Sequence, residues 1–379
     1  MRAVSVIGTG LIKFGRYPQV SLADLGWPAV KQAMADAGVA PKDIGAVLCG
    51  TGLGGPMPGQ RILGRLGMTG LPIINVENAC SSGSSAINLG SMAIASGEHD
   101  IVMVIGVEKL TRFNGGTIPL EREDWEVRNG LVMPALYGMR ARRYMNDHGL
   151  TREQLASVVV KSRRHAALNP DAQLQKPTTV EEVLQSRMIA DPFTLYQCCP
   201  TGDGAAVVIL CASELASNYS SKPIKVVASH IASGLFESGP RDMTSPEITV
   251  RCARETFEAA GLGPNDIDVA EVHDAFTSAE LMYYEAFGFC EPGQAAHLLE
   301  SGATSLGGRI PINPSGGLLS KGHPVAVTGA AQVVEVVRQL QGRCGARQVQ
   351  GARIGLTHAT GGGISGFDHG VCAIHIFST

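Results

Sequence analysis

One cysteine of the chain lies where the sequence predicts a strand to pass into a helix. Residues 71–76 are mostly apolar, as in a buried strand, and residues 84–95 are small and apolar, as in a packed helix. Cys80 falls in the turn between them, where the first unpaired N–H groups of the helix would point toward its sulfur. Such donors favour the thiolate and can bind a developing oxyanion. The turn alone leaves a packed core cysteine and a nucleophile equally open.

Three histidines add to this chemistry because each falls at a strand end or in a glycine-rich turn. They are His273 in EVHDAF, His323 in NPSGGLLSKGHPVAVTG and His358 in LTHATGGGISG. A single histidine is more often structural, but an imidazole beside a cysteine makes a thiolate nucleophile, and a second imidazole can donate to an oxyanion. The residues therefore predict acyl transfer through a thioester on Cys80.

The elements that must position these residues form a repeat. The segments AGVAPKDIGAVLCG and AAGLGPNDIDVAEVHDAF share four residues at a constant offset of 223 positions: Gly38, Pro41, Asp43 and Ile44 recur as Gly261, Pro264, Asp266 and Ile267. Each segment follows a predicted helix and precedes a predicted strand, which indicates two structurally equivalent halves. We expect an α/β protein of two similar halves, residues 1–221 and 222–379, packed in layers with the site between them.

Residues 111–201 interrupt the repeat and are interpreted as an insertion in the first half that lies over the site. A predicted helix over 138–147 has a basic face that includes Arg140 and Arg143. Such arginines can receive a phosphate-bearing arm of a substrate. For any one of them, a solvated helix face is an equally good interpretation.

Composition excludes several classes of function. The net charge is −3 and aromatic residues are 5% of the chain, so neither nucleic acid nor an anionic membrane is an expected partner. No apolar run approaches the ~20 residues that span a bilayer. The nine cysteines include no CxxC pair, which predicts neither a metal site nor a disulfide framework. With no signal-peptide pattern, a cytoplasmic location is expected.

The motifs NACSSG, EVHDAF and NPSGGLLSKGHPVAVTG, with the terminal glycine run, resemble the thiolase superfamily over essentially the whole chain. Within it the chain is similar to the branch of sterol-carrier-protein thiolases and acetyl-CoA acetyltransferases. The resemblance implies the thiolase fold with a CoA-binding loop insertion, and a homodimer or higher oligomer. It implies CoA as a substrate, without a covalently bound cofactor, and a small zinc-ribbon/OB-fold partner subunit in some relatives.

The resemblance also assigns roles. Cys80 matches the nucleophile, and His323 the base that takes its proton and donates to the substrate thioester oxygen. His273 matches the group that completes this first oxyanion site, where many thiolases carry Asn. The N–H of Cys80 and the backbone near Gly361 match the second oxyanion site.

Weaker matches for contact with substrate or CoA are Arg140, Arg143, Ser315 and Gly316.

One departure from the family concerns a second reactive cysteine. The two positions at which relatives carry it are occupied by Ala359, before the terminal glycines, and Ala275, inside HDAF. Cleavage still requires a donor for the departing carbanion. We hypothesise that His358 serves, with His273 as the competing candidate, since an imidazole has its pKa near the operating pH.

The predicted reaction is cleavage of a 3-oxoacyl-CoA by CoA, or the reverse Claisen condensation. Several segments, among them GTGLIKFGRYP, are similar to thiolases that split 2-benzoylsuccinyl-CoA into benzoyl-CoA and succinyl-CoA. Arg61, Arg65 or an insertion arginine would then meet the extra carboxylate.

Alternatives are an acetoacetyl-CoA-forming acetyltransferase, a retro-aldolase acting on a CoA ester, and a non-catalytic acyl-CoA or lipid binder. The related retro-aldolases lack the nucleophile, so Cys80 argues against that class.

Overall fold

A computed structural model describes residues 1–113, 117–236, 241–363 and 368–379. The fold is α/β, as predicted, and its main feature is a sheet of nine strands in the order β3-β2-β4-β7-β1-β8-β11-β10-β9. Their bounds are β1 Val4–Leu11, β2 Ala46–Gly50, β3 Ile73–Val76, β4 Ile101–Lys109, β7 Asp203–Ala212, β8 Ile224–Ser233, β9 Val269–Glu271, β10 Ile354–Gly361 and β11 Val371–Ser378. Three residue pairs between β1 and β8 join the strands of the two predicted halves.

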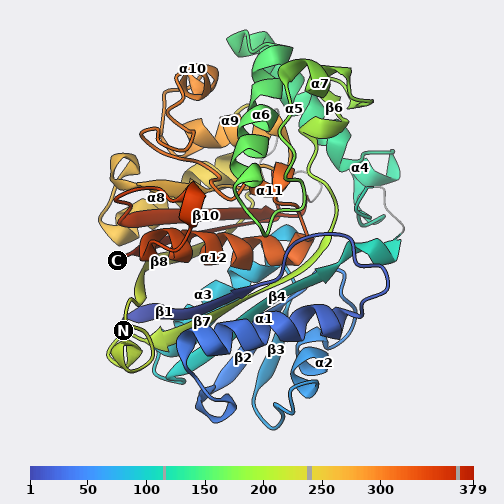
Figure 1. Ribbon diagram of the computed structural model, residues 1–379. Coiled ribbons are helices and arrows are strands. Elements are labelled where there is room, and N and C mark those ends of the chain that lie inside the picture. Colours follow the sequence, from blue (N-terminus) through green and yellow to red (C-terminus); the bar gives the residue numbers. More distant parts are fainter. Residues whose placement is uncertain (114–116, 237–240, 364–367) are drawn as a thin grey trace.

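Two helices lie between these two sets of strands, α3 (Ser82–Ala95) and α12 (Thr328–Gln341) (Figure 1). Most of their residues are buried all round, as expected for helices covered on both faces. Further helices cover the outer faces of the strands: α1 Leu22–Ala37, α2 Pro58–Gly64, α8 Glu247–Ala260 and α9 Thr277–Ala286. The layers run helix, strand, helix, strand, helix, and the N-termini of the two central helices lie at one end of the stack.

The predicted repeat is confirmed in its local structure. Helices α1 and α8 both end at a glycine in the left-handed conformation, Gly38 with φ 67° and Gly261 with φ 64°. In each copy an aspartate carboxylate then accepts a backbone N–H three residues earlier, at 2.8 Å for Asp43 and 2.7 Å for Asp266. The same side chains make the same turn twice. The division at residue 221 stays a prediction.

The insertion forms a helical layer above the central helices (Figure 1). It consists of α4 Trp125–Arg128, α5 Met133–His148, α6 Arg152–Ala167 and α7 Val180–Gln185, with the short strands β5 Met188–Ala190 and β6 Phe193–Thr194. Two further short helices lie in the second half, α10 Ala295–Glu300 and α11 Gly317–Ser320.

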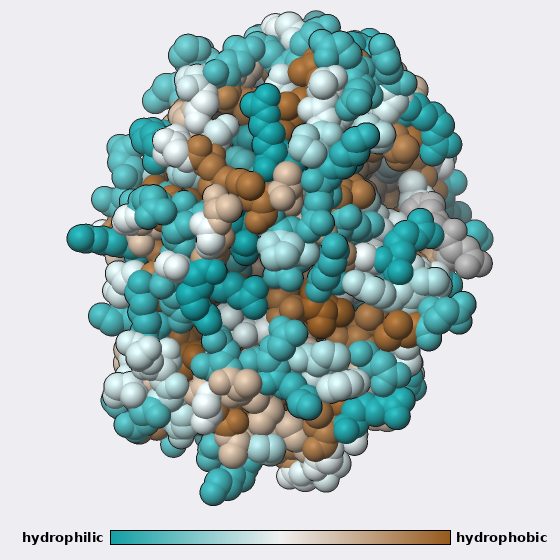
Figure 2. Space-filling view, in the orientation of Figure 1, coloured by the Kyte–Doolittle hydropathy of each residue, from teal (hydrophilic) through white to brown (hydrophobic). Residues whose placement is uncertain are grey.

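In the space-filling view, hydrophilic side chains predominate at both ends of the molecule, and apolar residues gather near its middle (Figure 2). Among the described helices, none has the length and apolar character needed to cross a membrane.

Candidate active site

Cys80 lies in a single 3₁₀ turn, Ala79–Ser81, between β3 and α3. The turn is tight: Ala79 has φ 48°, a left-handed conformation that costs a residue with a Cβ about 1–2 kcal/mol. Ser82 stabilises it, because its hydroxyl donates to the Ala79 carbonyl (2.7 Å) and accepts from the Asn78 N–H (2.9 Å). Helix α3 begins at Ser82, two residues before the predicted start.

The end of β10 closes against this turn. A side chain at Gly361 would place its Cβ 2.3 Å from the Asn78 carbonyl oxygen and 2.9 Å from the Ser81 nitrogen, so only glycine fits. This approach brings the N–H of Gly362 to the sulfur of Cys80, where it lowers the thiol pKa alongside the N–H of Cys80 itself. The predicted pair of backbone donors therefore lies at the sulfur, with Gly362 rather than Gly361 supplying the second N–H.

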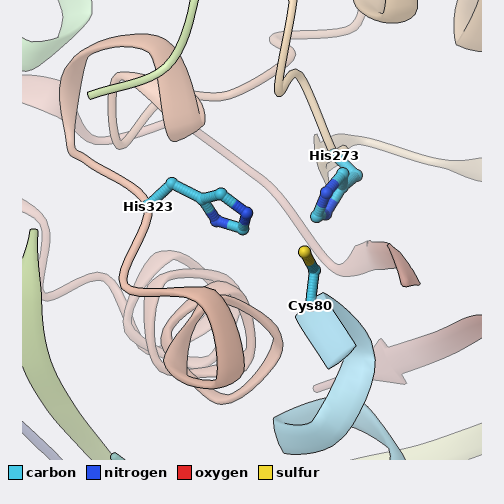
Figure 3. Close-up of side chains that lie close together, drawn as sticks. All are labelled: Cys80, His273 and His323. Atoms are coloured by element: carbon cyan, nitrogen blue, oxygen red, sulfur yellow. The ribbon is translucent and has the colours of Figure 1, made fainter. Parts of the chain in front are cut away.

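The structure brings Cys80, His273 and His323 together (Figure 3). The sulfur and one nitrogen of each imidazole all lie within 4.8 Å of one another. The two rings meet edge to face with centroids 5.1 Å apart. These atoms are also able to bind a soft metal ion, but an ion there would occupy the nucleophile, and the set fits acid–base chemistry on sulfur.

A hydrogen bond at Nδ1 fixes the orientation of the His323 ring. Its Nδ1 lies 2.7 Å from Oγ1 of Thr328, whose hydroxyl donates to the Pro324 carbonyl (3.4 Å). The hydroxyl oxygen therefore accepts the Nδ1–H, which leaves the lone pair of Nε2 free for the thiol proton.

Burial sets the resting charge of the site. Burial raises the pKa of the Cys80 thiol to about 12; the Gly362 N–H lowers it and the Glu108 carboxylate raises it further. Burial lowers the pKa of His323 to about 3. The resting pair is a neutral thiol and a neutral imidazole. The expectation that the helix N-terminus alone would favour a thiolate is wrong, because desolvation outweighs the donors.

His273 follows β9 and is 2% exposed. Its Nδ1 has no hydrogen-bond partner among the described residues. Its pKa is well below the usual value, first through burial and then through the nearby imidazoles of His323, His358 and His369. A neutral imidazole in the cavity wall, with one nitrogen within 4.8 Å of the Cys80 sulfur, is suited to hydrogen-bond a substrate oxygen.

His358 does not reach the cavity. It is fully buried, and its ring packs edge to face on Tyr283 and Phe287, with centroid distances of 4.4 and 5.2 Å. Nδ1 accepts the backbone N–H of His273 at 3.4 Å, and Nε2 lies 3.3 Å from the hydroxyl of Thr249. This placement argues against the acid–base role predicted for His358, since both nitrogens are used. Its contact instead positions His273.

The two arginines predicted to contact substrate or CoA do not line the cavity. Arg140 is 6% exposed and forms an ion pair with Asp368, while its Nε donates to the Met243 carbonyl at 3.1 Å. Arg143 is exposed and pairs with Asp147 one turn along α5, at 2.6 Å. Arg140 is therefore a structural cation, and Arg143 lies on the solvated face.

Ser315 and Gly316 lie beneath the site. The Ser315 N–H and hydroxyl both bond to the Glu271 carboxylate, at 2.9 and 2.7 Å. Gly316 has φ 102°, and a Cβ there would meet the Cβ of Ala166 at 2.6 Å. Both shape the loop before α11 rather than contact a ligand.

A cavity of about 430 Å³ opens onto Cys80, His273 and His323 and extends under the insertion. Its wall includes residues that the sequence analysis did not single out: Arg16, Tyr137, Arg187, Cys199 and His369. No local motif marks them, because they come from separate loops and from α5. Arg61 and Arg65 line a different surface depression, and Arg65 lies 3.4 Å from Asp24.

The layered halves, and a cysteine with two histidines at their junction, are typical of acyltransferases that work through a thioester. The chain belongs to the thiolase family. Residues 4–214 match the family description "Thiolase, N-terminal domain", and residues 236–372 match "Thiolase C-terminal domain-like".

Relatives of the chain agree with this class. The acetyl-CoA acetyltransferase of Methanothermobacter thermautotrophicus is 44% identical over the full length of both chains. The benzoylsuccinyl-CoA thiolase subunit BbsB of Thauera aromatica is 41% identical over 96% of this chain and 95% of its own length. Human sterol carrier protein 2 is 38% identical over 95% of this chain and 70% of its own length.

Solved structures share the fold. The Ltp2–ChsH2(DUF35) aldolase superimposes with a TM-score of 0.87 at 26% identity, covering 100% of this chain and 98% of that one. Human mitochondrial 3-ketoacyl-CoA thiolase does so with a TM-score of 0.75 at 19% identity, covering 100% and 99%. The protein is thus an enzyme of the thiolase type, an acyltransferase for which CoA is a substrate.

Proposed function

We propose that the enzyme cleaves a 3-oxoacyl-CoA whose acyl group is aromatic and whose α-substituent bears a carboxylate, as in 2-benzoylsuccinyl-CoA. Benzoyl-Cys80 and succinyl-CoA would form first, and free CoA would then release benzoyl-CoA. Condensation is the same path in reverse. The observation that carries the proposal is the meeting of Cys80, His273 and His323 within 4.8 Å at the floor of the cavity.

The first step uses the geometry of His323. As the sulfur of Cys80 attacks the 3-oxo carbon, its proton passes to Nε2 of His323. The N–H groups of Cys80 and Gly362 hold the resulting oxyanion. When the tetrahedral species collapses, the bond between C2 and C3 breaks, and charge moves to the thioester oxygen. The charged His323 and the imidazole of His273 then bind that oxygen.

The cavity wall supports an aromatic substrate. Tyr137 and Phe276 stack with centroids 4.4 Å apart, and their rings present an apolar surface next to the nucleophile. Arg16 and Arg187 line the same cavity from exposed positions, and neither joins an ion pair within the described ranges. Either guanidinium is suited to a substrate carboxylate or a CoA phosphate. The benzoylsuccinyl-CoA thiolase subunit of Thauera aromatica, at 41% identity, supports the same substrate.

Acetoacetyl-CoA formation is the second candidate. The relative named acetyl-CoA acetyltransferase is 44% identical over the whole chain, slightly more than the benzoylsuccinyl-CoA thiolase subunit. The nucleophile and both histidines serve either reaction. The acyl group that Cys80 accepts therefore distinguishes the two reactions.

A small partner subunit is part of the proposal. The relative BbsB is named as a subunit, and the aldolase structure of similar fold is named as a complex with a DUF35 protein. A homodimer or higher oligomer is proposed from the family resemblance.

Mass spectrometry of the intact protein tests the function. The protein is incubated with acetyl-, benzoyl- or succinyl-CoA, with and without a co-purifying small protein. We expect a mass gain that is absent in Cys80→Ala and retained in Cys198→Ala, a matched variant of another cavity cysteine. Preferential benzoyl loading supports the aromatic substrate, and acetyl loading alone supports the acetyltransferase. No loading under any condition contradicts the thiolase mechanism.

A further inference from the structure

Cleavage leaves a carbanion that needs a proton, and the usual thiol donors are missing. Ala359 and Ala275 carry no proton to give, and His358 is enclosed behind the wall of the cavity. The donor must therefore be another group that lines the cavity near Cys80.

Four polar side chains in sequential contact lead to this cavity, joined by one hydrogen bond and two ion pairs. The hydroxyl of Tyr137 lies 2.8 Å from Nε2 of His369, and Nδ1 of His369 lies 3.2 Å from the Asp368 carboxylate. Asp368 in turn pairs with Arg140, one turn after Tyr137 on α5. All four side chains are nearly buried, with Tyr137 and His369 5% and 3% exposed.

Tyr137 and His369 both line the cavity that contains Cys80. The ring of Tyr137 stacks on Phe276, which fixes the direction of its hydroxyl. Burial, followed by the neighbouring Tyr283, holds the pKa of Tyr137 well above its usual value, so the phenol keeps its proton at rest. The phenol and the nucleophile therefore line the same cavity, in which the departing carbon must be protonated.

Asp368 and Arg140 hold Tyr137 and His369 in one arrangement. The Asp368 carboxylate is kept ionised: burial raises its pKa, but the Arg140 guanidinium and His369 more than offset this and hold it well below its usual range. An ionised carboxylate beside Nδ1 retains a proton on that nitrogen, so Nε2 is the atom that exchanges protons with the phenol.

We propose that Tyr137 and His369, oriented by Asp368 and Arg140, are the acid–base pair that exchanges a proton with the substrate α-carbon. The inference rests on the proposed thiolase function. It gives the phenol and imidazole the task of the missing second cysteine.

The proton balance closes over one turnover. In its charged form the pair holds two exchangeable protons, one on the phenol oxygen and one on Nε2, besides the proton retained on Nδ1. The electron pair of the broken C–C bond forms a C–H bond with the phenol proton, and the Nε2 proton moves to the phenol oxygen. In the second half, the thiol of CoA gives its proton back to the pair as its sulfur attacks the acyl carbon on Cys80. As the acyl group leaves Cys80, His323 returns its proton to the sulfur, so no further reactant is needed.

The rate of proton exchange at the substrate α-carbon distinguishes the role of Tyr137 and His369 from the acylation of Cys80. The full protein, with any partner that co-purifies, is incubated in D₂O with acetyl-CoA and succinyl-CoA, and deuterium at the α-carbon is followed by mass spectrometry. We expect Tyr137→Phe and His369→Gln to lose about 10²–10⁴-fold in exchange rate, the usual effect of removing a general acid–base group. Loading of Cys80 should slow about tenfold or less, because a thiolate leaves with little help from a proton.

Tyr144→Phe is the matched control. Tyr144 lies two turns further along α5, is 2% exposed and bonds to Glu285 away from the cavity. Its loss should leave exchange unchanged. Exchange at the wild-type rate in both folded test variants overturns the inference, and Cys199→Ala then tests one of the two other cavity thiols. A wild-type protein that never loads an acyl group contradicts the proposed function instead.

Discussion

Nδ1 of His323 lies 2.7 Å from Oγ1 of Thr328, the first residue of the central helix α12. The contact ties the proposed general base to a helix that is buried along almost its whole length. Because the Thr328 hydroxyl donates to Pro324, it presents only its oxygen to the ring. A hydroxyl group thus performs the orienting task that a carboxylate performs in many triads, without adding a charge to the site.

Thr328→Val should slow loading of Cys80 about 10–100-fold, the effect of losing about 1.5–3 kcal/mol of hydrogen bonding to an imidazolium. Acyl-enzyme formation followed by quenched-flow mass spectrometry measures this rate. Thr256→Val is the control, since Thr256 is equally buried and its hydroxyl also donates to a carbonyl four residues earlier, at 2.6 Å. Equal rates in the two variants would contradict the orienting role of Thr328.

The charge state of Cys80 predicts a distinct pH dependence. Since burial raises its pKa to about 12, the thiolate fraction should increase tenfold for each pH unit through the neutral range. Alkylation by iodoacetamide, measured at Cys80 by peptide mass spectrometry, should show this slope from pH 6 to 9. A plateau near pH 7 would instead indicate a preformed ion pair with His323. The same reaction on Cys80→Ala gives the contribution of other cysteines.

His273→Asn and His273→Ala should differ strongly. If His273 only donates a hydrogen bond to the thioester oxygen, Asn preserves the donor and Ala removes it. We expect cleavage to slow about 10²–10³-fold in the Ala variant, as for loss of an oxyanion donor, and much less in the Asn variant. Equal losses would show that the imidazole itself exchanges a proton, the alternative left open by the sequence.

The sequence predicted those parts of the site that are carried by local motifs. Cys80, His273 and His323 each sit at the junction of a strand or a glycine-rich loop with a helix, and such junctions are visible in composition. The repeated turns at Asp43 and Asp266 could also be recognised in the sequence, because each turn is made by residues three positions apart.

The sequence did not predict how deeply a side chain lies behind the cavity wall, and the role predicted for His358 depended on that depth. His358 lies on β10 two residues before Thr360, on the same face of the strand, and Thr360 lines the cavity. That step of about 6.6 Å places the imidazole behind Tyr283, whose hydroxyl contacts Thr360 at 3.3 Å. Tyr137 and His369 were missed for the opposite reason: they meet across 232 positions of the chain, and no spacing rule connects them.

A buried ion pair beneath the site should contribute strongly to stability. Lys161 on α6 contacts Glu280 on α9, and their side chains are 4% and 0% exposed. Lys161→Met would leave a buried carboxylate without its cation, at a cost of about 3–5 kcal/mol. Urea denaturation followed by circular dichroism measures the loss. Arg254→Met, which removes an exposed partner of Glu258 on α8, should change the midpoint little. Comparable losses would contradict the structural role of the pair.

Gly361→Ala should damage catalysis more than stability. Its Cβ would meet the Asn78 carbonyl oxygen at 2.3 Å, so the strand end or the Cys80 turn must move, and with it the N–H of Gly362. Because a displacement of about 1 Å at a reacting group can cost 10²-fold, we expect loading of Cys80 to fall by about that factor. Gly363→Ala is the matched control, as no atom of the described residues lies within 4 Å of its added Cβ. Full loading in Gly361→Ala would contradict the assignment of this strand end to the oxyanion site.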